Sequence, residues 1–114
     1  MENKYLRLLL VSSTYEVLLN VDGQLPQTIY KTKVDLRLQI ADTLKEQFDF
    51  TITSRQIHQL EYSHQAEDIV VIHVSAELED KILQAEDARG WFWFDRDLMP
   101  AKTSDKLEAV IRSL

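Results

Sequence analysis

The spacing of the apolar residues changes near Val34, and this change limits the fold more than any other feature of the sequence. Upstream of it, Tyr5 to Val11 and Tyr15 to Val21 are short β-favouring runs, and the turn pair Asp22-Gly23 follows the second run. Downstream, apolar residues recur at helical spacing, at Val34, Leu38, Ala41, Leu44 and Phe48. We therefore predict a two-stranded hairpin, an extended connection over residues 24–33, and a helix from Val34 to Phe48.

The second half of the chain continues this mixture of strands and helices. Gln56 to Tyr62 and Ile69 to Leu78 are predicted to be two strands of a hairpin, joined by the polar segment 63–68. Trp91 to Phe94 is typical of a short aromatic strand. A last helix is expected to begin near Asp105 with a capping-box-like start that uses Glu108. Its docked face is predicted to contain Leu107, Val110, Ile111 and Leu114.

The predicted order of elements is β-β-α-β-β-β-α, with an acidic, irregular segment over residues 77–90. This order favours an α/β (α+β) fold in which a mixed β-sheet is sandwiched between α-helices. Because the chain has 114 residues, we expect a single domain over residues 1–114.

The composition excludes several classes of protein. The absence of cysteine excludes a disulfide scaffold, a thiol nucleophile and any thiolate metal site. A net charge of −6 with scattered basic residues argues against general nucleic-acid binding. The apolar run from Leu8 to Val11 is too short for a secretory signal or a membrane span, so we expect no membrane association and a cytoplasmic location.

Two segments carry a family resemblance. Leu25-Pro26 follows the second predicted strand, and a predicted helix begins soon after it. Gly90 to Pro100, with the sequence GWFWFDRDLMP, precedes the terminal helix. Together with the order of elements, these segments resemble the Nudix (MutT-like) superfamily, which has a Leu-Pro-Gly-Gly segment and a late Trp-Phe, acidic, Leu-Pro segment at these places. The resemblance covers nearly the whole chain and implies a Nudix-like fold.

The Nudix signature box, G-x5-E-x7-R-E-U-x-E-E-x-G-U with U a bulky aliphatic residue, aligns without a gap from Thr28. Glu46 keeps one glutamate of the box, and Leu44 and Phe50 keep its two bulky positions. Thr28 and Asp49 replace its two glycines, and Asp42 replaces its arginine. Its other three glutamates are replaced by Val34, Thr43 and Gln47. The box is therefore degenerate.

The resemblance implies that the usual Nudix chemistry is absent. In the family, clustered glutamates hold divalent cations against a pyrophosphate, and only one of them remains here. We therefore expect no catalytic residue, no metal site and no cofactor, and a ligand-binding, regulatory or interaction module. Weak candidates for ligand contact are Glu46, Gln47 and Glu86. The alternative is a divergent hydrolase of a nucleoside diphosphate derivative, with Mg²⁺ held by Glu46 and loop acids such as Glu86.

Several features leave the partner open. A nucleotide-like small molecule or a protein partner would fit the resemblance. A homodimer is also possible and would bury part of Trp91 to Phe94. Packing in the core or over a helix is the simpler role for this aromatic run. The acidic residues between Glu77 and Asp87 are most simply a solvated loop. His58 and His73 lie on strands that are predicted to pair, but two histidines without a third ligand make a poor zinc site.

Overall fold

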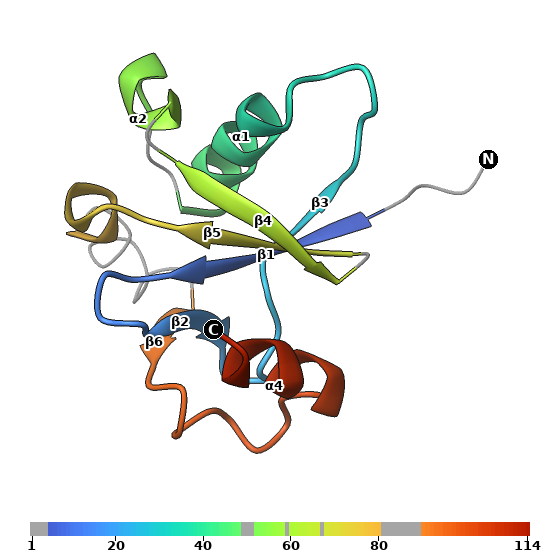
Figure 1. The fold of residues 1–114 in the computed structure, drawn as a ribbon, viewed down its shortest axis with the longest axis vertical. Coiled ribbons are helices and arrows are strands. Elements are labelled where there is room, and N and C mark those ends of the chain that lie inside the picture. The colour runs from blue at the N-terminus through green and yellow to red at the C-terminus, as the bar shows by residue number, and fades with distance from the viewer. Residues whose placement is uncertain (1–4, 49–51, 59, 67, 81–89) are drawn as a thin grey trace.

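A computed structural model describes residues 5–48, 52–58, 60–66, 68–80 and 90–114. Within these residues, six strands form one mixed sheet in the order β4-β5-β1-β2-β6, and β3 pairs with β1 beside this path. The strands are β1 (Tyr5–Val11), β2 (Val17–Asn20), β3 (Gln27–Ile29), β4 (Glu61–Ala66), β5 (Ile69–His73) and β6 (Trp91–Phe94). Both faces of the sheet are covered by helices (Figure 1).

The helices divide between the two faces of the sheet. Helices α1 (Leu36–Phe48) and α2 (Ser54–His58) lie on one face, and α4 (Asp105–Arg112) lies on the other (Figure 1). Residues 76–80 are also helical. The predicted mixed sheet between helices is therefore confirmed. In the described part of the chain, every helix is too short or too polar to cross a membrane.

Strand β1 lies at the centre of this arrangement. It runs parallel to β5, with Leu9 opposite Val71, and antiparallel to β2 and β3. Its side chains alternate between the two faces, as in any strand. Leu6, Leu8 and Leu10 enter the core under α1, whereas Leu9 and Val11 enter the core under α4.

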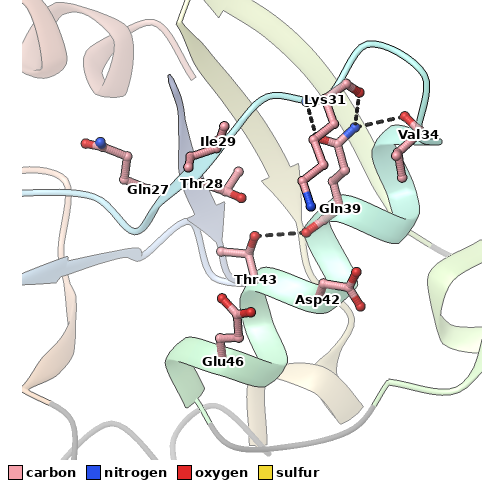
Figure 2. A pocket seen from close by; sticks show the side chains of 9 residues that line it. All are labelled: Gln27, Thr28, Ile29, Lys31, Val34, Gln39, Asp42, Thr43 and Glu46. Carbon is pink, nitrogen blue, oxygen red and sulfur yellow. Dashed lines mark hydrogen bonds between the residues drawn. The ribbon is translucent and has the colours of Figure 1, made fainter. Parts of the chain in front are cut away.

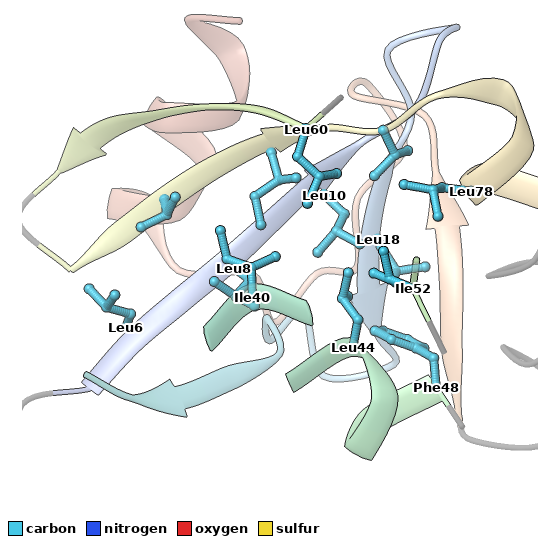
Figure 3. Close-up of a cluster of buried hydrophobic side chains, with 13 residues drawn as sticks. Leu6, Leu8, Leu10, Leu18, Ile40, Leu44, Phe48, Ile52, Leu60 and Leu78 are labelled. Atoms are coloured by element: carbon cyan, nitrogen blue, oxygen red, sulfur yellow. The ribbon is translucent and has the colours of Figure 1, made fainter. Parts of the chain in front are cut away.

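The two cores differ in the elements that close them. The first contains Ile40, Leu44 and Phe48 from α1 together with β1 and β5 residues (Figure 3). The second contains Leu107, Val110 and Ile111 from α4, which confirms most of the predicted docked face. Leu114, the remaining predicted member, packs against this core while only partly buried.

Helix α4 is held at its start by its cap and by a close approach of two loops. The Ser104 hydroxyl accepts a hydrogen bond from the Leu107 N–H at 3.3 Å, so Ser104 is the N-cap and the predicted cap at Asp105 is one residue late. The preceding residue, Thr103, packs directly on Gly23. A Cβ atom at Gly23 would lie 2.7 Å from the Thr103 Cα, and Gly23 also has a positive φ of 71°. Only glycine fits both conditions.

A carboxylate joins α4 to the sheet. Asp68 accepts from Arg7 of β1 at 2.8 Å and from Lys106 of α4 at 3.1 Å. Partial burial by itself raises the pKa of Asp68, but the hydrogen bond from Lys106 and the charge of Arg7 outweigh it, and the pKa lies below its ordinary value of 3.8. Asp68 therefore stabilises the folded state in its charged form.

Two predicted strands are partly helical, because the sequence contains helix caps that outweigh the strand pattern. The predicted strand from Gln56 is wrong at its start, since Gln56 to His58 belong to α2. Thr53 and Gln56 form a reciprocal capping box: the Gln56 N–H donates to the Thr53 hydroxyl at 3.3 Å, and the Thr53 N–H donates to Gln56 Oε1 at 3.0 Å. Likewise Leu78 is helical, because the Ser75 hydroxyl accepts its N–H at 3.3 Å.

Other boundaries differ by a few residues. Strand β4 continues to Ala66, so most of the polar segment predicted as a turn is an edge strand with a bulge, where polar residues are tolerated. Strand β3 forms within the predicted extended connection through its pairing with β1. Helix α1 begins at Leu36, two residues later than predicted, and β2 is shorter than predicted at both ends. Phe50 and Asp49 lie outside the described residues.

The first core predicts a contrast between two leucines of α1. Leu44 is fully buried, whereas Leu38 is 51% exposed. Leu44→Ala removes contacts that the surroundings cannot replace, and we expect it to lower the free energy of unfolding by about 2–5 kcal/mol. Leu38→Ala is the matched control and should change it by less than about 0.5 kcal/mol. Urea unfolding followed by circular dichroism measures both, and equal effects would contradict this account of the core.

Asp68 predicts a pH-dependent stability difference. Because its pKa is lowered by folding, its contribution is present above the unfolded pKa and is lost as the pH falls through the folded pKa. At pH 7, Asp68→Asn should lower the free energy of unfolding by about 0.5–1.5 kcal/mol, the scale of two partly exposed ion pairs. Urea unfolding in steps down to about pH 2 should show this difference shrinking below pH 3.8. Asp97→Asn removes an exposed carboxylate away from this ion-pair network, and at pH 7 it should change the free energy of unfolding by less than about 0.5 kcal/mol.

Candidate functional site

A cavity of about 390 Å³ lies between β3 and α1. Apart from Gln27, its lining residues fall within the segment from Thr28 that was aligned with the Nudix signature box in the sequence. Figure 2 shows the residues that line it, which are Gln27, Thr28, Ile29, Lys31, Val34, Gln39, Asp42, Thr43 and Glu46. The wall therefore combines one short strand, the loop that follows it and one face of a helix.

The helical wall follows from residue spacing. Gln39, Asp42, Thr43 and Glu46 are separated by three or four residues, so they share one face of α1. Asp42 and Glu46 are exposed and stand one turn apart with the same charge, an arrangement that destabilises an isolated helix slightly. Lys31 is the one basic residue in the described lining, so the cavity carries a net negative charge.

Gln39 fixes the loop that forms the upper wall. Its side chain is 5% exposed. The Lys31 N–H donates to Gln39 Oε1 at 2.9 Å, and Gln39 Nε2 donates to the carbonyl oxygens of Lys31 and Val34, both at 2.8 Å (Figure 2). All of these bonds are internal, and a buried amide with its partners satisfied acts as a structural clamp.

Thr43 is also engaged within the protein. Its side chain is 4% exposed, and its hydroxyl donates to the Gln39 carbonyl oxygen at 2.9 Å. Bonding of a threonine hydroxyl to the carbonyl one turn earlier is a local helix interaction. At the position that the sequence alignment matched to a signature glutamate, the structure has a neutral, internally bonded hydroxyl.

The structure describes two of the three candidate contact residues and places them on different faces of α1. Glu46 lines the cavity. Gln47 is half-buried on α1 and is absent from the described lining, because one residue further along a helix points about 100° away. Glu86 lies outside the described residues. The sequence reasoning missed Asp42 as a cavity residue, since the box comparison treated it only as a lost arginine, although its spacing from Glu46 was the available signal.

The described side chains do not form a metal centre. Among them, no group of three or more histidine, aspartate or glutamate residues is placed to hold a metal ion. The cavity provides Asp42 and Glu46 as its two acidic residues. Mg²⁺ requires near-octahedral oxygen coordination, and two exposed carboxylates supply a small part of it.

The other residues noted in the sequence have structural roles or lie apart. Trp91 packs edge-on against Phe48, with ring centroids 5.9 Å apart, and Phe94 packs against the core under α4. Both faces of β6 thus cover a core, as expected for the simpler role of this run. The predicted hairpin is confirmed, since β4 pairs with β5 and places His73 opposite Glu61. His58 lies in α2 instead of on a strand, so the expectation that it could face His73 is wrong.

The acidic residues after β5 also make contacts within the chain, as far as they are described. Gln56 Nε2 donates to Glu77 Oε1 at 3.0 Å, which joins α2 to the helical residues 76–80. The Ser13 hydroxyl donates to Glu79 Oε2 at 3.0 Å. Asp87 lies outside the described residues. Glu77 and Glu79 are therefore parts of interelement contacts.

A second cavity, of about 330 Å³, lies near the start of α4. Its charged side chains are already paired: Arg7 with Asp68 at 2.8 Å, and Lys102 with Asp22 at 3.4 Å. In the first cavity, by contrast, the two carboxylates of α1 are unpaired among the described residues. Neither Asp42 nor Glu46 makes an ion pair or a side-chain hydrogen bond with another described residue. The cavity between β3 and α1 is thus the better candidate site.

Comparison with known proteins supports the fold. A crystal structure of a mutT/nudix family protein from Listeria innocua matches with a TM-score of 0.56, covering 97% of this chain and 90% of that chain, at 11% sequence identity. No known protein family matches the sequence, and no curated protein matches it. The fold is therefore Nudix-like, and at this identity the likeness concerns the fold alone.

The Gln39 clamp predicts a local effect of mutation. Gln39→Ala removes three hydrogen bonds to Lys31 and Val34, and we expect it to lower the free energy of unfolding by about 1–3 kcal/mol. It should also speed hydrogen exchange of the Lys31 amide. Gln47→Ala, a change of the same residue type on the same helix, is the control and should leave that exchange rate unchanged. Equal exchange of Lys31 in both variants would contradict the clamp.

Proposed function

We propose that this chain is a non-catalytic Nudix-like binding module, which receives a ligand or partner in the cavity between β3 and α1. The observation that carries the proposal is the state of Thr43. At the place of a signature glutamate, a buried hydroxyl is bonded to the backbone of its own helix. Such a group has no charge to offer a cation, and its bond to Gln39 makes it part of the scaffold.

The charge of the cavity supports binding without metal. Hydrolysis of a pyrophosphate needs cations that neutralise the phosphate oxygens and activate water. With Asp42, Glu46 and Lys31 as the charged residues of the described lining, a polyphosphate lacking bound metal would meet a net negative surface. A neutral or cationic group suits this cavity better, so the protein-partner reading is favoured over the nucleotide-like ligand.

Metal binding and turnover test the proposal. Isothermal titration of the protein with Mg²⁺ and Mn²⁺ should give a Kd of about 1 mM or weaker, because two exposed carboxylates hold such ions poorly. A phosphate-release screen against mixed nucleoside diphosphate derivatives with either metal should show no turnover above background. The matched variant is Glu46→Gln, which keeps the size of the side chain and removes its charge.

One result would replace this proposal with a divergent hydrolase. Metal-dependent phosphate release that is lost in Glu46→Gln, and kept in Glu61→Gln at an exposed position on β4, would show a working catalytic site. Phosphate release that Glu46→Gln leaves unchanged would place the activity away from Glu46, and it would also contradict the proposal unless it is lost on further purification of the protein.

A further inference from the structure

Strand β3 has one paired edge and one open edge. Its register with β1 places Leu6 opposite Thr28 and Arg7 opposite Gln27. The Leu8 N–H donates to the Pro26 carbonyl oxygen at 2.8 Å, so hydrogen-bonded pairs alternate from there and include Leu6 with Thr28. The N–H and C=O groups of Gln27 and Ile29 consequently point away from β1.

These outward groups border the cavity. Gln27 and Ile29 both line it, and within the described residues neither residue's backbone N–H or C=O on this edge has a hydrogen-bond partner. Unpaired strand edges are templates for the addition of another extended chain. The open edge of β3 and the acidic face of α1 are therefore walls of the same cavity.

The next residue whose backbone groups point away from β1 is Lys31, and these groups are already hydrogen-bonded within the protein as a neighbouring strand would bond them. Lys31 lies two residues beyond Ile29, and its N–H and C=O are both bonded by the side-chain amide of Gln39, at 2.9 and 2.8 Å. An amide that accepts from one residue's N–H and donates to its C=O supplies the two bonds a neighbouring strand would make. The Gln39 side chain therefore occupies the backbone groups of Lys31. The outward backbone groups of Gln27 and Ile29 remain without a partner among the described residues.

The opposite wall selects the charge of the occupant. Asp42 and Glu46 face the cavity from one side of α1 without an ion-pair partner among the described residues. A lysine or arginine side chain would relieve the repulsion between these carboxylates and form charge-assisted hydrogen bonds with them. Ile29 and Val34, both partly exposed, offer apolar contact to the neighbouring positions of an extended chain.

Resting on the proposed function, we propose that the cavity binds an extended peptide segment that carries lysine or arginine. The peptide adds as a strand to the open edge of β3 through Gln27 and Ile29. Its basic side chain lies against Asp42 and Glu46. This assigns backbone recognition to β3 and charge selection to α1.

A set of synthetic peptides tests the backbone and the charge separately. The probe is a capped heptapeptide in which lysine alternates with valine. The charge control replaces each lysine by glutamate. Two backbone controls carry N-methyl groups on alternate nitrogens, one for each of the two possible sets, because only one set can face β3. Binding is followed by nuclear magnetic resonance titration of the ¹⁵N-labelled full chain.

The expected result has three parts. The lysine peptide shifts the amide signals of Gln27, Ile29 and their α1 neighbours, and it slows hydrogen exchange at the amides of Gln27 and Ile29 by at least about tenfold at saturation. The glutamate peptide does not bind. One N-methylated set abolishes binding, while the other set retains it.

Variants of the protein provide the reciprocal test. The double variant Asp42→Asn with Glu46→Gln should weaken binding of the lysine peptide by roughly three- to tenfold, and Glu61→Gln on β4 should leave it unchanged. Ile29→Pro removes an outward N–H that makes no bond within the described chain, so folding is retained and binding is lost. Ile29→Val keeps that N–H and loses one methyl group of the apolar contact, so it should retain the binding that Ile29→Pro loses, with a modest loss of affinity.

The inference is overturned if the two peptide charges bind equally, if both N-methylated sets bind, or if the shifted signals lie away from β3. Its failure is distinguishable from failure of the proposed function. Metal-dependent phosphate release at Glu46 would refute the binding module itself. A chain that shows neither phosphate release nor lysine-peptide binding would refute the peptide and leave the non-catalytic assignment standing.

Discussion

Burial of β1 on both faces is the constraint on which the rest of the structure depends. Leu8 and Leu10 fill the core under α1, and Leu9 fills the core under α4, so one strand serves two cores. A strand buried in this way must be paired along its edges and covered on each side, because its backbone polar groups have no access to water. The parallel partner β5, the antiparallel partners and the two helical layers follow from that requirement.

The candidate site also follows from β1. One edge of β1 is shared by two short strands: β3 pairs with Tyr5 to Arg7, and β2 pairs at Val11. Strand β3 is three residues long and ends where the chain turns toward α1. No described strand pairs with its other edge, and the cavity lies there, between β3 and α1. The Gln39 amide closes part of that cavity with polar bonds, and the carboxylates of α1 face what remains.

Sequence patterns predicted the elements that bury a periodic apolar face. β1, α1, β6 and α4 are in this class. The stripe predicted for α1 is correct at Leu44 and Phe48 and wrong at Val34 and Leu38, which are exposed. The elements that were missed depend on capping or pairing instead. Helix α2 was readable from the Thr53 and Gln56 capping box, whereas β3 had no signal of its own, since three residues form a strand only when β1 is beside them. Glu46 was a candidate because it aligns with a glutamate of the signature box, whereas Lys31 falls where the box specifies no residue type.

The facing carboxylates of α1 tie the stability of the helix to what the cavity contains. Asp42 and Glu46 repel each other across one helical turn, so the chain alone carries a small unfavourable term at this surface. A cation placed between them removes that term and adds attraction, and any species that binds the folded chain alone shifts the folding equilibrium toward the folded state. Conversely, a substitution that neutralises Asp42 or Glu46 removes their repulsion and stabilises α1, but it also lowers the affinity of this surface for a cation. The stability of this helix and its attraction for a cation are therefore opposed properties of the same two side chains.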